Sequence, residues 1–341
     1  MSNFKSTYDP GVQVSMDDVL CLHRNENLLV GREWAVDAAR DLVEQAAISS
    51  YPDATCMPLR TAIAGLHGVR AEQVFLGNGA DEVLSDLFGV LHETYDCMHV
   101  LDVRFKVYDL LAERLGFRQE VLPGGAFETG HVDPTGFSGF AVVDSPNAIT
   151  GRSVPTDELM QLAADENSYV IWDNVYGEYG HDSIPSPLPP NMAFVRSFSK
   201  FYGMAGLRLG YCIAGEGLIA RMLAQKDVFN VNAMAQVMAM EAIRRQASFE
   251  SLRDELVGNR DYLATGLEKL GFSVLPSNSV GILATHPAHS GASIQAALLE
   301  RKIAVRRFDD DRIRDHIRIT VAPMDQIKHF LATLADCLKA P

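Results

Sequence analysis

Length, composition and charge exclude several classes of protein. The chain has 341 residues, 47% of them hydrophobic, and a formal net charge of -14 with a sequence pI near 5.1. Such an acidic chain lacks the basic face that nucleic acids and anionic membranes require, so the composition favours small-molecule chemistry. The first residues form no apolar signal core, and no run reaches the roughly 18 apolar residues that span a bilayer. We therefore expect a cytoplasmic protein.

The cysteines and histidines show no pattern of a structural metal or disulfide site. The five cysteines are odd in number, widely spaced and free of any C-x-x-C pair, so neither a disulfide framework nor a zinc site is expected. His286 and His289 have helical metal-ligand spacing, but Pro287 lies between them and favours a loop. We expect no metal site.

In chain order, an irregular segment over 1–34 is expected to join the smaller of two domains, and a helical pattern follows from Trp34 to Ala46. Apolar strand candidates then alternate with helices. The strands are expected at 74–76, 98–101, 120–122, 140–143, 169–172, 194–195 and 209–213, and the helices at 80–92, 105–116, 155–165 and 216–226. Continuous apolar strands separated by helices predict an α/β fold with a mainly parallel seven-stranded sheet.

The C-terminal third has a different pattern. A long helix is predicted over 248–270, because leucines recur there at intervals of three, four and seven residues. Short strands and two further helices follow, an α+β arrangement. The strands are expected at 272–275, 281–284, 303–305 and 317–321, and the helices at 293–301 and 324–338. The expected division is a large domain over 35–250 and a small domain over 251–341.

The stretch from Ser197 to Tyr211 carries the main functional signal. A strand-like run leads to Ser197, Ser199 and Lys200, and a glycine-interrupted turn brings Arg208 eight residues after the lysine. A lysine amine can condense with an aldehyde, while hydroxyls and a guanidinium can hold a phosphate. Taken alone, the lysine is more simply a surface residue. The whole stretch, however, resembles the S-x-S-K-x-x-x-x-x-G-x-R-x-G motif of fold-type I pyridoxal-phosphate enzymes.

Two further motifs fit the same resemblance. Gly79, Ala80 and Asp81 follow a strand and open a helix, where backbone amides and the helix dipole suit a phosphate. Asp173 ends a strand, with Tyr176 three residues on. The resemblance implies that Asp173 faces the pyridine nitrogen of the cofactor and that Tyr176 binds its ring oxygen. Out of context, these motifs would be an empty strand-to-helix turn, a helix cap and a core ring.

The remaining matches follow the order found in histidinol-phosphate aminotransferases, which the chain resembles from about residue 20 to 335. Asn25 lies in a stretch resembling N-E-N-P, which implies a substrate contact for Asn25. Arg318 lies in a stretch resembling L-R-I-T-V, whose arginine binds the substrate carboxylate. Phe105 and Tyr108 match the P-x-Y-x-x-Y element, which implies that Phe105 stacks on the cofactor ring and that Tyr108 contacts substrate. Tyr51 resembles a tyrosine that reaches the neighbouring subunit's cofactor phosphate, which implies a homodimer with shared active sites.

The segment from Ser145 to Gly151 departs from the pattern. Ala148 stands where the family has an asparagine that hydrogen-bonds the cofactor's ring oxygen. Asn147 is the candidate replacement, provided that the loop shifts by one residue. The pair Arg306 and Arg307 lies shortly before Arg318 in the same small domain, where it could contact substrate, and we favour the simpler interpretation of a solvated pair.

These observations predict a homodimeric pyridoxal-phosphate aminotransferase acting on an L-amino acid or an amino acid phosphate, with Lys200, Asp173 and Tyr176 as catalytic residues. Two alternatives stay open. One keeps the cofactor but changes the reaction to elimination or replacement, decarboxylation or oxidation by dioxygen, and Ala148 motivates it. The other is a binding or regulatory protein without a cofactor.

Overall fold

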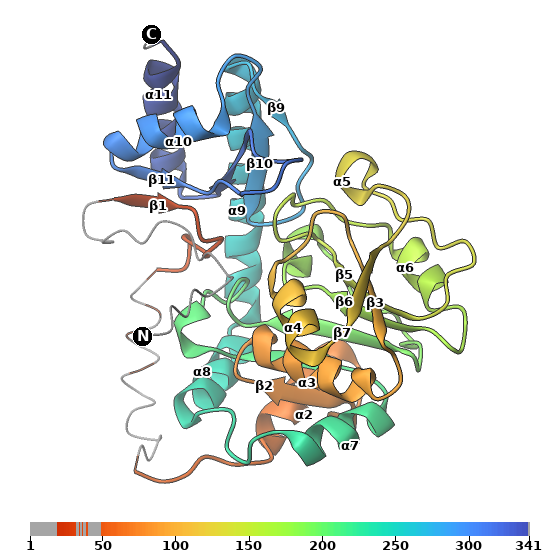
Figure 1. The fold of residues 1–341 in the computed structure, drawn as a ribbon. Coiled ribbons are helices and arrows are strands. Elements are labelled where there is room, and N and C mark those ends of the chain that lie inside the picture. Colours follow the sequence, from red (N-terminus) through yellow and green to blue (C-terminus); the bar gives the residue numbers. More distant parts are fainter. Residues whose placement is uncertain (1–18, 32–33, 35, 37–38, 40–48, 340–341) are drawn as a thin grey trace, which may run out of the picture.

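A computed structural model describes residues 19–31, 34, 36, 39 and 49–339. Most of the helix expected from Trp34 to Ala46, and the first part of the expected N-terminal segment, lie outside the described residues. The described elements lie in the order that the sequence predicts (Figure 1). No helix among them is long and apolar enough to cross a bilayer.

The larger part of the molecule is built on one sheet of seven strands, in the order β2-β8-β7-β6-β5-β3-β4. β8 is antiparallel to both of its neighbours, and every other pairing is parallel. The strands are β2 (Val74–Gly77), β3 (Cys97–Val100), β4 (Arg118–Val121), β5 (Phe140–Asp144), β6 (Tyr169–Asp173), β7 (Met192–Ser197) and β8 (Gly210–Ile213). The predicted mainly parallel α/β sheet is confirmed.

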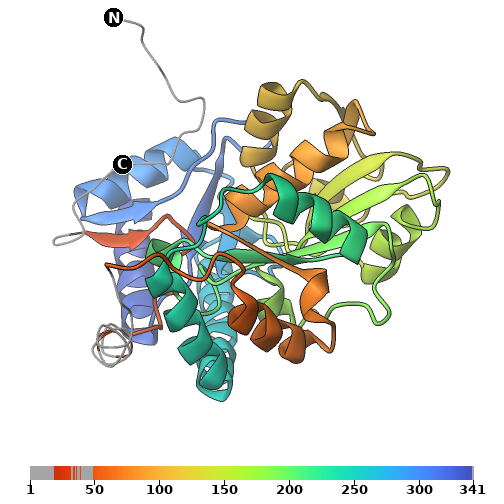
Figure 2. The ribbon, with the colours of Figure 1, turned by 90° about the horizontal axis from the view of Figure 1, so that it is seen from below.

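Helices cover both faces of this sheet because its strands are apolar on both sides. In the central strands, alternate residues belong to two different clusters, such as Ile171 on one face and Trp172 on the other, whereas the edge strand β4 is exposed. Figure 2 shows α7 and α2 on opposite sides of the sheet. One face carries α3 (Ala80–His92), α4 (Val107–Leu115) and α7 (Glu216–Gln225). The other face carries α2 (Met57–His67), α6 (Thr156–Leu162) and α8 (Ala233–Arg244), and α5 (Ala126–Thr129) lies near α6.

The C-terminal residues form a second, smaller core. The long helix α9 (Gln246–Lys269) runs along both parts of the molecule (Figure 1). An antiparallel sheet in the order β12-β10-β9 packs with the last two helices. These elements are β9 (Ser273–Val274), β10 (Gly281–Thr285), β12 (His316–Thr320), α10 (Gly291–Glu300) and α11 (Met324–Lys339). The domain boundary expected at residue 250 stays a prediction, and α9 begins before it.

The structure adds several elements to those expected from the sequence, among them β1 (Leu20–Leu22) and α8. β1, expected to be irregular, pairs in parallel with β11 (Ile303–Val305) at the far end of the chain. α8 has apolar residues on most of its faces, which hides its helical period, and it begins after Asn232, whose side chain accepts the Ala235 amide hydrogen at 2.8 Å. The β1 pairing joins the N-terminal segment to the smaller core.

Candidate active site

A cavity of about 680 Å³ lies at the carboxyl ends of β5, β6 and β7, where parallel sheets bind their ligands. Residues at the end of the large sheet line it on one side, and residues of the smaller core such as Arg306 and Arg318 line it on the other. Most of the site residues expected from the sequence line it: Asn25, Ala80, Asp81, Phe105, Asp173, Tyr176, Ser197, Ser199, Lys200, Arg208 and Arg318. Gly79, Tyr51, Tyr108 and Asn147 are not among the lining residues.

Lys200 lies just beyond the end of β7 and points its amine into the cavity. Nζ donates a hydrogen bond to the main-chain oxygen of Asn25 at 3.1 Å. It also lies 5.5 Å from the centroid of the Tyr176 ring. The half-buried amine therefore lies between the N-terminal segment and an aromatic ring, near the carboxyl ends of the parallel strands.

Asp173 ends β6 and is almost fully buried, with 5% of its surface exposed. Oδ2 accepts a hydrogen bond from the Tyr108 hydroxyl at 2.6 Å. Burial raises the pKa of Asp173 to about 6, although the Tyr108 hydrogen bond lowers it. Tyr108 itself is completely buried behind this carboxyl. The predicted substrate contact of Tyr108 does not agree with this placement, because Asp173 separates its hydroxyl from the cavity.

Asn25 connects the two sides of the cavity. Its side-chain amide donates to the Tyr176 hydroxyl at 3.3 Å and to the Ala148 carbonyl at 3.2 Å. Its main-chain amide donates to Thr320 Oγ1 at 3.0 Å. Asn25 has a φ of 53°, in the left-handed region that asparagine tolerates better than most residues. It therefore positions Tyr176 and ties the N-terminal segment to the loop after β5.

One end of the cavity is shaped to accept an anion. Gly79 precedes α3 with a φ of 87°, and a Cβ there would lie 2.5 Å from Nη2 of Arg208. Arg208 donates to Asp81 Oδ2 at 2.9 Å. Ser197 Oγ accepts the Ser199 amide hydrogen at 3.1 Å, which turns the chain at the end of β7. The N-terminus of α3, two hydroxyls and a guanidinium thus meet at a place kept open by a glycine.

Arginines lie on the side of the cavity formed by the smaller core. Arg318 on β12 donates to the carbonyls of Ala148 at 2.7 Å and His23 at 3.0 Å. Arg306 pairs with it through main-chain hydrogen bonds and also lines the cavity, which favours the substrate-contact alternative for Arg306 over a solvated pair. Both guanidinium carbons lie close to the Phe308 ring, at 5.3 Å for Arg306 and 5.2 Å for Arg318. The bridge between the two strands, which the sequence did not indicate, brings Arg306 inward.

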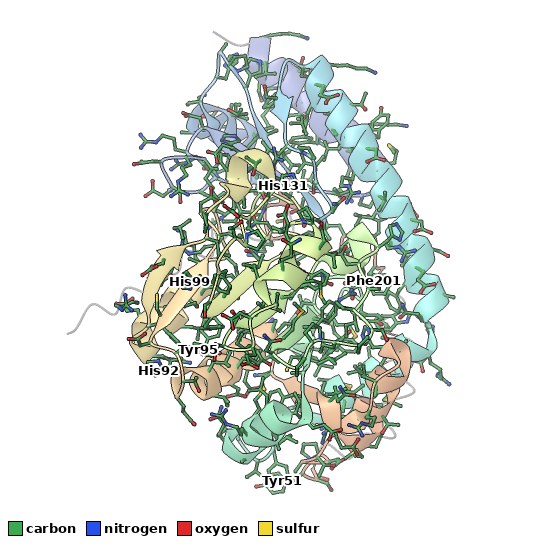
Figure 3. All side chains as sticks on the ribbon, turned by 90° about the vertical axis from the view of Figure 1, so that its right-hand side faces the viewer. Tyr51, His92, Tyr95, His99, His131 and Phe201 are labelled. Carbon is green, nitrogen blue, oxygen red and sulfur yellow. The ribbon has the colours of Figure 1, made fainter. Side chains whose placement is uncertain are left out.

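Asn147 and Tyr51 do not line this cavity. The Asn147 amide donates to the Val103 carbonyl at 2.8 Å, and its Oδ1 accepts the amide hydrogens of Ile149 and Thr150. The loop has not shifted, so the expected replacement of the missing asparagine by Asn147 does not agree with the structure. Tyr51 is 82% exposed and lies at the rim of the molecule, far from α10 and α11 (Figure 3).

Two groups of potential metal ligands lie away from the cavity. His286 and His289 form a short antiparallel bridge around a turn, so the predicted loop is confirmed. Cys97, His99 and Glu120 have ligand atoms within 4.8 Å of one another at the sheet edge, where Figure 3 labels His99. Glu120 is exposed and lies 3.5 Å from both His99 and Arg118, so surface ion pairing accounts for this group.

Comparison with known proteins decides the family. Residues 17–334 match the family described as aminotransferase class I and II. The chain belongs to this family. The aminotransferase is 35% identical over 338 residues to a protein named histidinol-phosphate aminotransferase 2 of Rhizobium meliloti (strain 1021), and the match covers 97% of this chain and 96% of the relative.

Solved structures support the same architecture. The aminotransferase superposes with a TM-score of 0.82 on histidinol-phosphate aminotransferase from Sinorhizobium meliloti in complex with pyridoxal-5'-phosphate, at 19% identity and over 94% of this chain and 91% of that chain. It superposes equally well, at 0.82, on L-threonine-O-3-phosphate decarboxylase from Porphyromonas gingivalis, at 21% identity and over 94% of this chain and 100% of that chain. At these identities the likeness shows the fold alone, and fold-type I is confirmed.

The predicted enzyme class and cofactor, pyridoxal 5'-phosphate (PLP), are confirmed by the family. The residues that line the cavity of the aminotransferase also fit the chemical groups of PLP. At the anion-binding end, Gly79 and Gly210 allow Arg208 and the start of α3 to approach closely, since a Cβ on Gly79 would collide with the Arg208 guanidinium and one on Gly210 with the Ala80 amide nitrogen. Lys200 and Asp173 line the same cavity. The donor set therefore matches a phosphate, an aldehyde and a ring nitrogen.

Proposed function

We propose that this enzyme transfers the amino group of an L-amino acid, or of an amino acid phosphate of the histidinol phosphate kind, to a 2-oxo acid. One observation carries the proposal: an amine, a buried carboxyl and an arginine, at Lys200, Asp173 and Arg318, line one cavity. The names of the curated relatives support the phosphate-bearing substrate class.

The residues at the anion-binding end would hold the cofactor phosphate. Ser197, Ser199 and Arg208 would donate to it together with the amides of α3, where Gly79, Ala80 and Asp81 begin the helix. The ion pair with Asp81 would keep the Arg208 guanidinium oriented before binding. Phe105 lines the cavity and would cover one face of the ring.

The chemistry divides between the cofactor and the chain. When bound, PLP supplies an electron sink for the charge left when a bond at the substrate Cα breaks. Lys200 would bind the aldehyde covalently and, once released by the substrate amine, would take the proton from the substrate Cα through Nζ. The hydrogen bond from Lys200 to the Asn25 carbonyl would steer the free amine during this transfer.

Asp173 would keep the ring nitrogen protonated. A cation beside a buried carboxyl favours the ionised form, and would lower the pKa that burial has raised to about 6. Tyr108 donates to the same carboxyl and would orient it, so we assign Tyr108 a positioning role rather than a substrate contact. Tyr176, held by Asn25, would donate to the ring oxygen.

The arginines would select the substrate. Arg318 would bind a carboxylate or phosphate through two parallel hydrogen bonds. Arg306, next to it in the cavity wall, would accommodate a second negative charge or the rest of a phosphate group. This pair supports an anionic substrate, and it does not by itself distinguish an amino dicarboxylate from an amino acid phosphate.

We also propose a homodimer in which Tyr51 of one subunit completes the partner's active site. Tyr51 stacks on Phe229 with ring centroids 4.5 Å apart, and both rings are exposed beside Val228. Exposed aromatic and aliphatic side chains that gather in one place favour a protein interface. We further propose a large domain over 35–250 and a small domain over 251–341, which the segment 1–34 joins. We also propose that the enzyme is cytoplasmic.

A second PLP reaction on an amino acid is supported by one observation, the alanine at position 148. Its methyl group cannot donate a hydrogen bond to the ring oxygen, and this changes the electronics of the site relative to the family pattern. Elimination or replacement, decarboxylation, or oxidation by dioxygen would need no 2-oxo acid. The requirement for an acceptor therefore separates this candidate from transamination.

The test compares amine donors at a fixed concentration of 2-oxoglutarate. L-histidinol phosphate, L-histidinol, L-aspartate and L-phenylalanine are assayed with the wild-type enzyme and with Arg306→Ala. The proposal expects turnover with at least one anionic donor, and a KM for that donor about tenfold or more higher in the variant, since a charge-assisted hydrogen bond contributes about 1.5–3 kcal/mol. Amine transfer from none of the donors, with PLP bound, would contradict the proposed substrate class.

A further inference from the structure

The loop after β5 leaves one hydrogen-bonding position of the site without its expected side chain. Ala148 lines the cavity, and its carbonyl accepts hydrogen bonds from Arg318 at 2.7 Å and Asn25 at 3.2 Å. These contacts fix the main chain at this place in the cavity wall. The side chain is a methyl group, which has neither donor nor acceptor.

The neighbouring asparagine does not fill this gap. Asn147 is 3% exposed and lies outside the lining of the cavity. Both ends of its side chain are engaged with main-chain groups: the amide with Val103 at 2.8 Å, and the oxygen with Ile149 at 2.9 Å and Thr150 at 2.8 Å. Turning it inward would break all three hydrogen bonds in a buried place.

Asp144 is a buried polar residue next to the position of the missing asparagine side chain. It ends β5, directly beside Asp173 in the register of β5 and β6, and it lines the cavity with only 2% of its surface exposed. Oδ2 accepts the amide hydrogen of Ala148 at 3.1 Å. Oδ1 has no hydrogen-bond partner among the described residues. The residue that precedes the loop lacking the asparagine therefore lines the cavity and carries a fully buried carboxyl oxygen without a hydrogen-bond partner among the described residues.

The surroundings of Asp144 favour its neutral form. Burial raises the pKa of the Asp144 carboxyl well above its usual range, and the neighbouring carboxyl of Asp173 raises it further, although the main-chain amides of Ala148, Phe105 and Asp144 itself favour the charged form. Tyr108 from α4 is the other titratable group that faces it closely, and the cations of Lys200 and Arg318 line the same cavity. A neutral carboxyl can donate a hydrogen bond, which a carboxylate cannot.

We propose that Asp144, in its protonated form, donates the hydrogen bond to the ring oxygen of the cofactor that an asparagine at position 148 would donate. Ala148 keeps the backbone contacts of this position, and Asp144 supplies its donor from the end of the adjoining strand. This inference rests on the proposed cofactor contacts of the cavity. It makes Asp144 a cofactor-binding residue that tunes the protonation of the cofactor.

The test uses the absorbance of the holoenzyme without substrate, measured as a function of pH. A donor to the anionic ring oxygen lowers the pH at which the bound cofactor changes its absorbance, because it competes with the proton held on the imine nitrogen. In Asp144→Ala we expect this midpoint to rise by about one pH unit, a tenfold change in the protonation equilibrium. Asp144→Asn keeps a donor and a group that accepts the Ala148 amide, so its midpoint should change little.

A restoring variant sharpens the test. Asp144→Ala combined with Ala148→Asn should return the midpoint toward the wild-type value, because the side-chain amide is then back at position 148. A midpoint in Asp144→Ala that is unchanged, or lowered, would overturn the inference, as would equal shifts in Asp144→Ala and Asp144→Asn. An absence of any cofactor absorbance in the wild-type protein would contradict the proposed function instead.

Asp144→Ala removes the partner of a buried amide and could prevent folding, so a second measurement uses the intact protein. Infrared difference spectra between apoenzyme and holoenzyme report the C=O stretch of a protonated carboxyl. We expect a carboxylic acid band that shifts when PLP binds and that is missing in Asp144→Asn. The same difference spectrum in both proteins would overturn the inference.

Discussion

The two ends of the cavity are built in different ways. At the anion-binding end, Gly79, Lys200 and Arg208 come from two short stretches, and local turns set their positions. At the other end, Ala148 meets Asn25 and Arg318, which lie 123 and 170 residues away along the chain. We expect substitutions at the first end to remove or weaken the bound cofactor, and substitutions at the second to leave it bound but with altered electronic properties.

Lys200→Ala should have the largest effect. The variant loses the amine that would bind the cofactor and move the substrate proton, so we expect turnover to fall by about 10²–10⁴-fold or more. The absorbance of covalently bound cofactor should disappear as well. Lys269→Ala, at an exposed lysine in the last turn of α9, is the matched control and should retain both. Retention of turnover in Lys200→Ala would contradict the proposed role.

Asp173→Asn should separate activity from stability. The folded-state pKa of Asp173 lies above its value in the unfolded chain, so its contribution to stability is full below about pH 4 and is lost as the pH rises through about 6. A shift of about two pH units corresponds to about 3 kcal/mol. We therefore expect the apoenzyme of the Asp173→Asn variant to be more stable than wild type by up to about 3 kcal/mol at pH 8, and by less at pH 5.

The measurement for Asp173→Asn is urea unfolding of both apoenzymes at the two pH values, with turnover assayed in parallel. Turnover should fall by about 10²-fold, because the neutral amide does not hold the ring nitrogen protonated. A wild-type apoenzyme as stable as the variant at pH 8 would show that burial does not raise the pKa of Asp173 as described.

Gly79→Ala tests the anion-binding end. The added Cβ would lie 2.5 Å from Nη2 of Arg208 and would force an alanine into a φ of 87°. Arg208 must then move, and we expect PLP to bind about 10–100-fold more weakly in titrations of the apoenzyme. Gly217→Ala in α7 is the control, since its Cβ would meet nothing within 4 Å. Equal affinities in the two variants would mean that the cradle around Gly79 does not hold the phosphate.

Tyr51→Ala should have a smaller effect that depends on the partner subunit. Loss of one hydrogen bond from the partner predicts PLP binding about 2- to 10-fold weaker, since such a bond contributes about 0.5–1.5 kcal/mol. Tyr262→Ala, which removes another exposed tyrosine, is the control. Sedimentation of the wild-type protein gives the oligomeric state. A monomer with full activity would contradict the shared site.

Features set by one continuous stretch of sequence could be predicted, whereas those set by contacts between distant residues could not. The central strands of the large sheet follow from apolar runs, and the residues around Lys200 follow from one stretch whose turns are local. For Arg306, the sequence left substrate contact and a solvated position both open, because the bridge to Arg318 that brings it to the cavity is a spatial relation. Likewise, the sequence did not indicate that Tyr108 lies behind Asp173 or that Asn147 is occupied within its own turn. Both depend on which face of a loop or helix is buried.

The most direct measurement of the central claim is a single half-reaction followed by absorbance. Holoenzyme is mixed with an active amine donor in the absence of any 2-oxo acid, and 2-oxoglutarate is added afterwards. Transamination predicts that the absorbance of the aldehyde form is lost once per active site, with one equivalent of keto product, and returns only when the acceptor is added. Continued release of product without an acceptor, with the aldehyde form persisting, would contradict it.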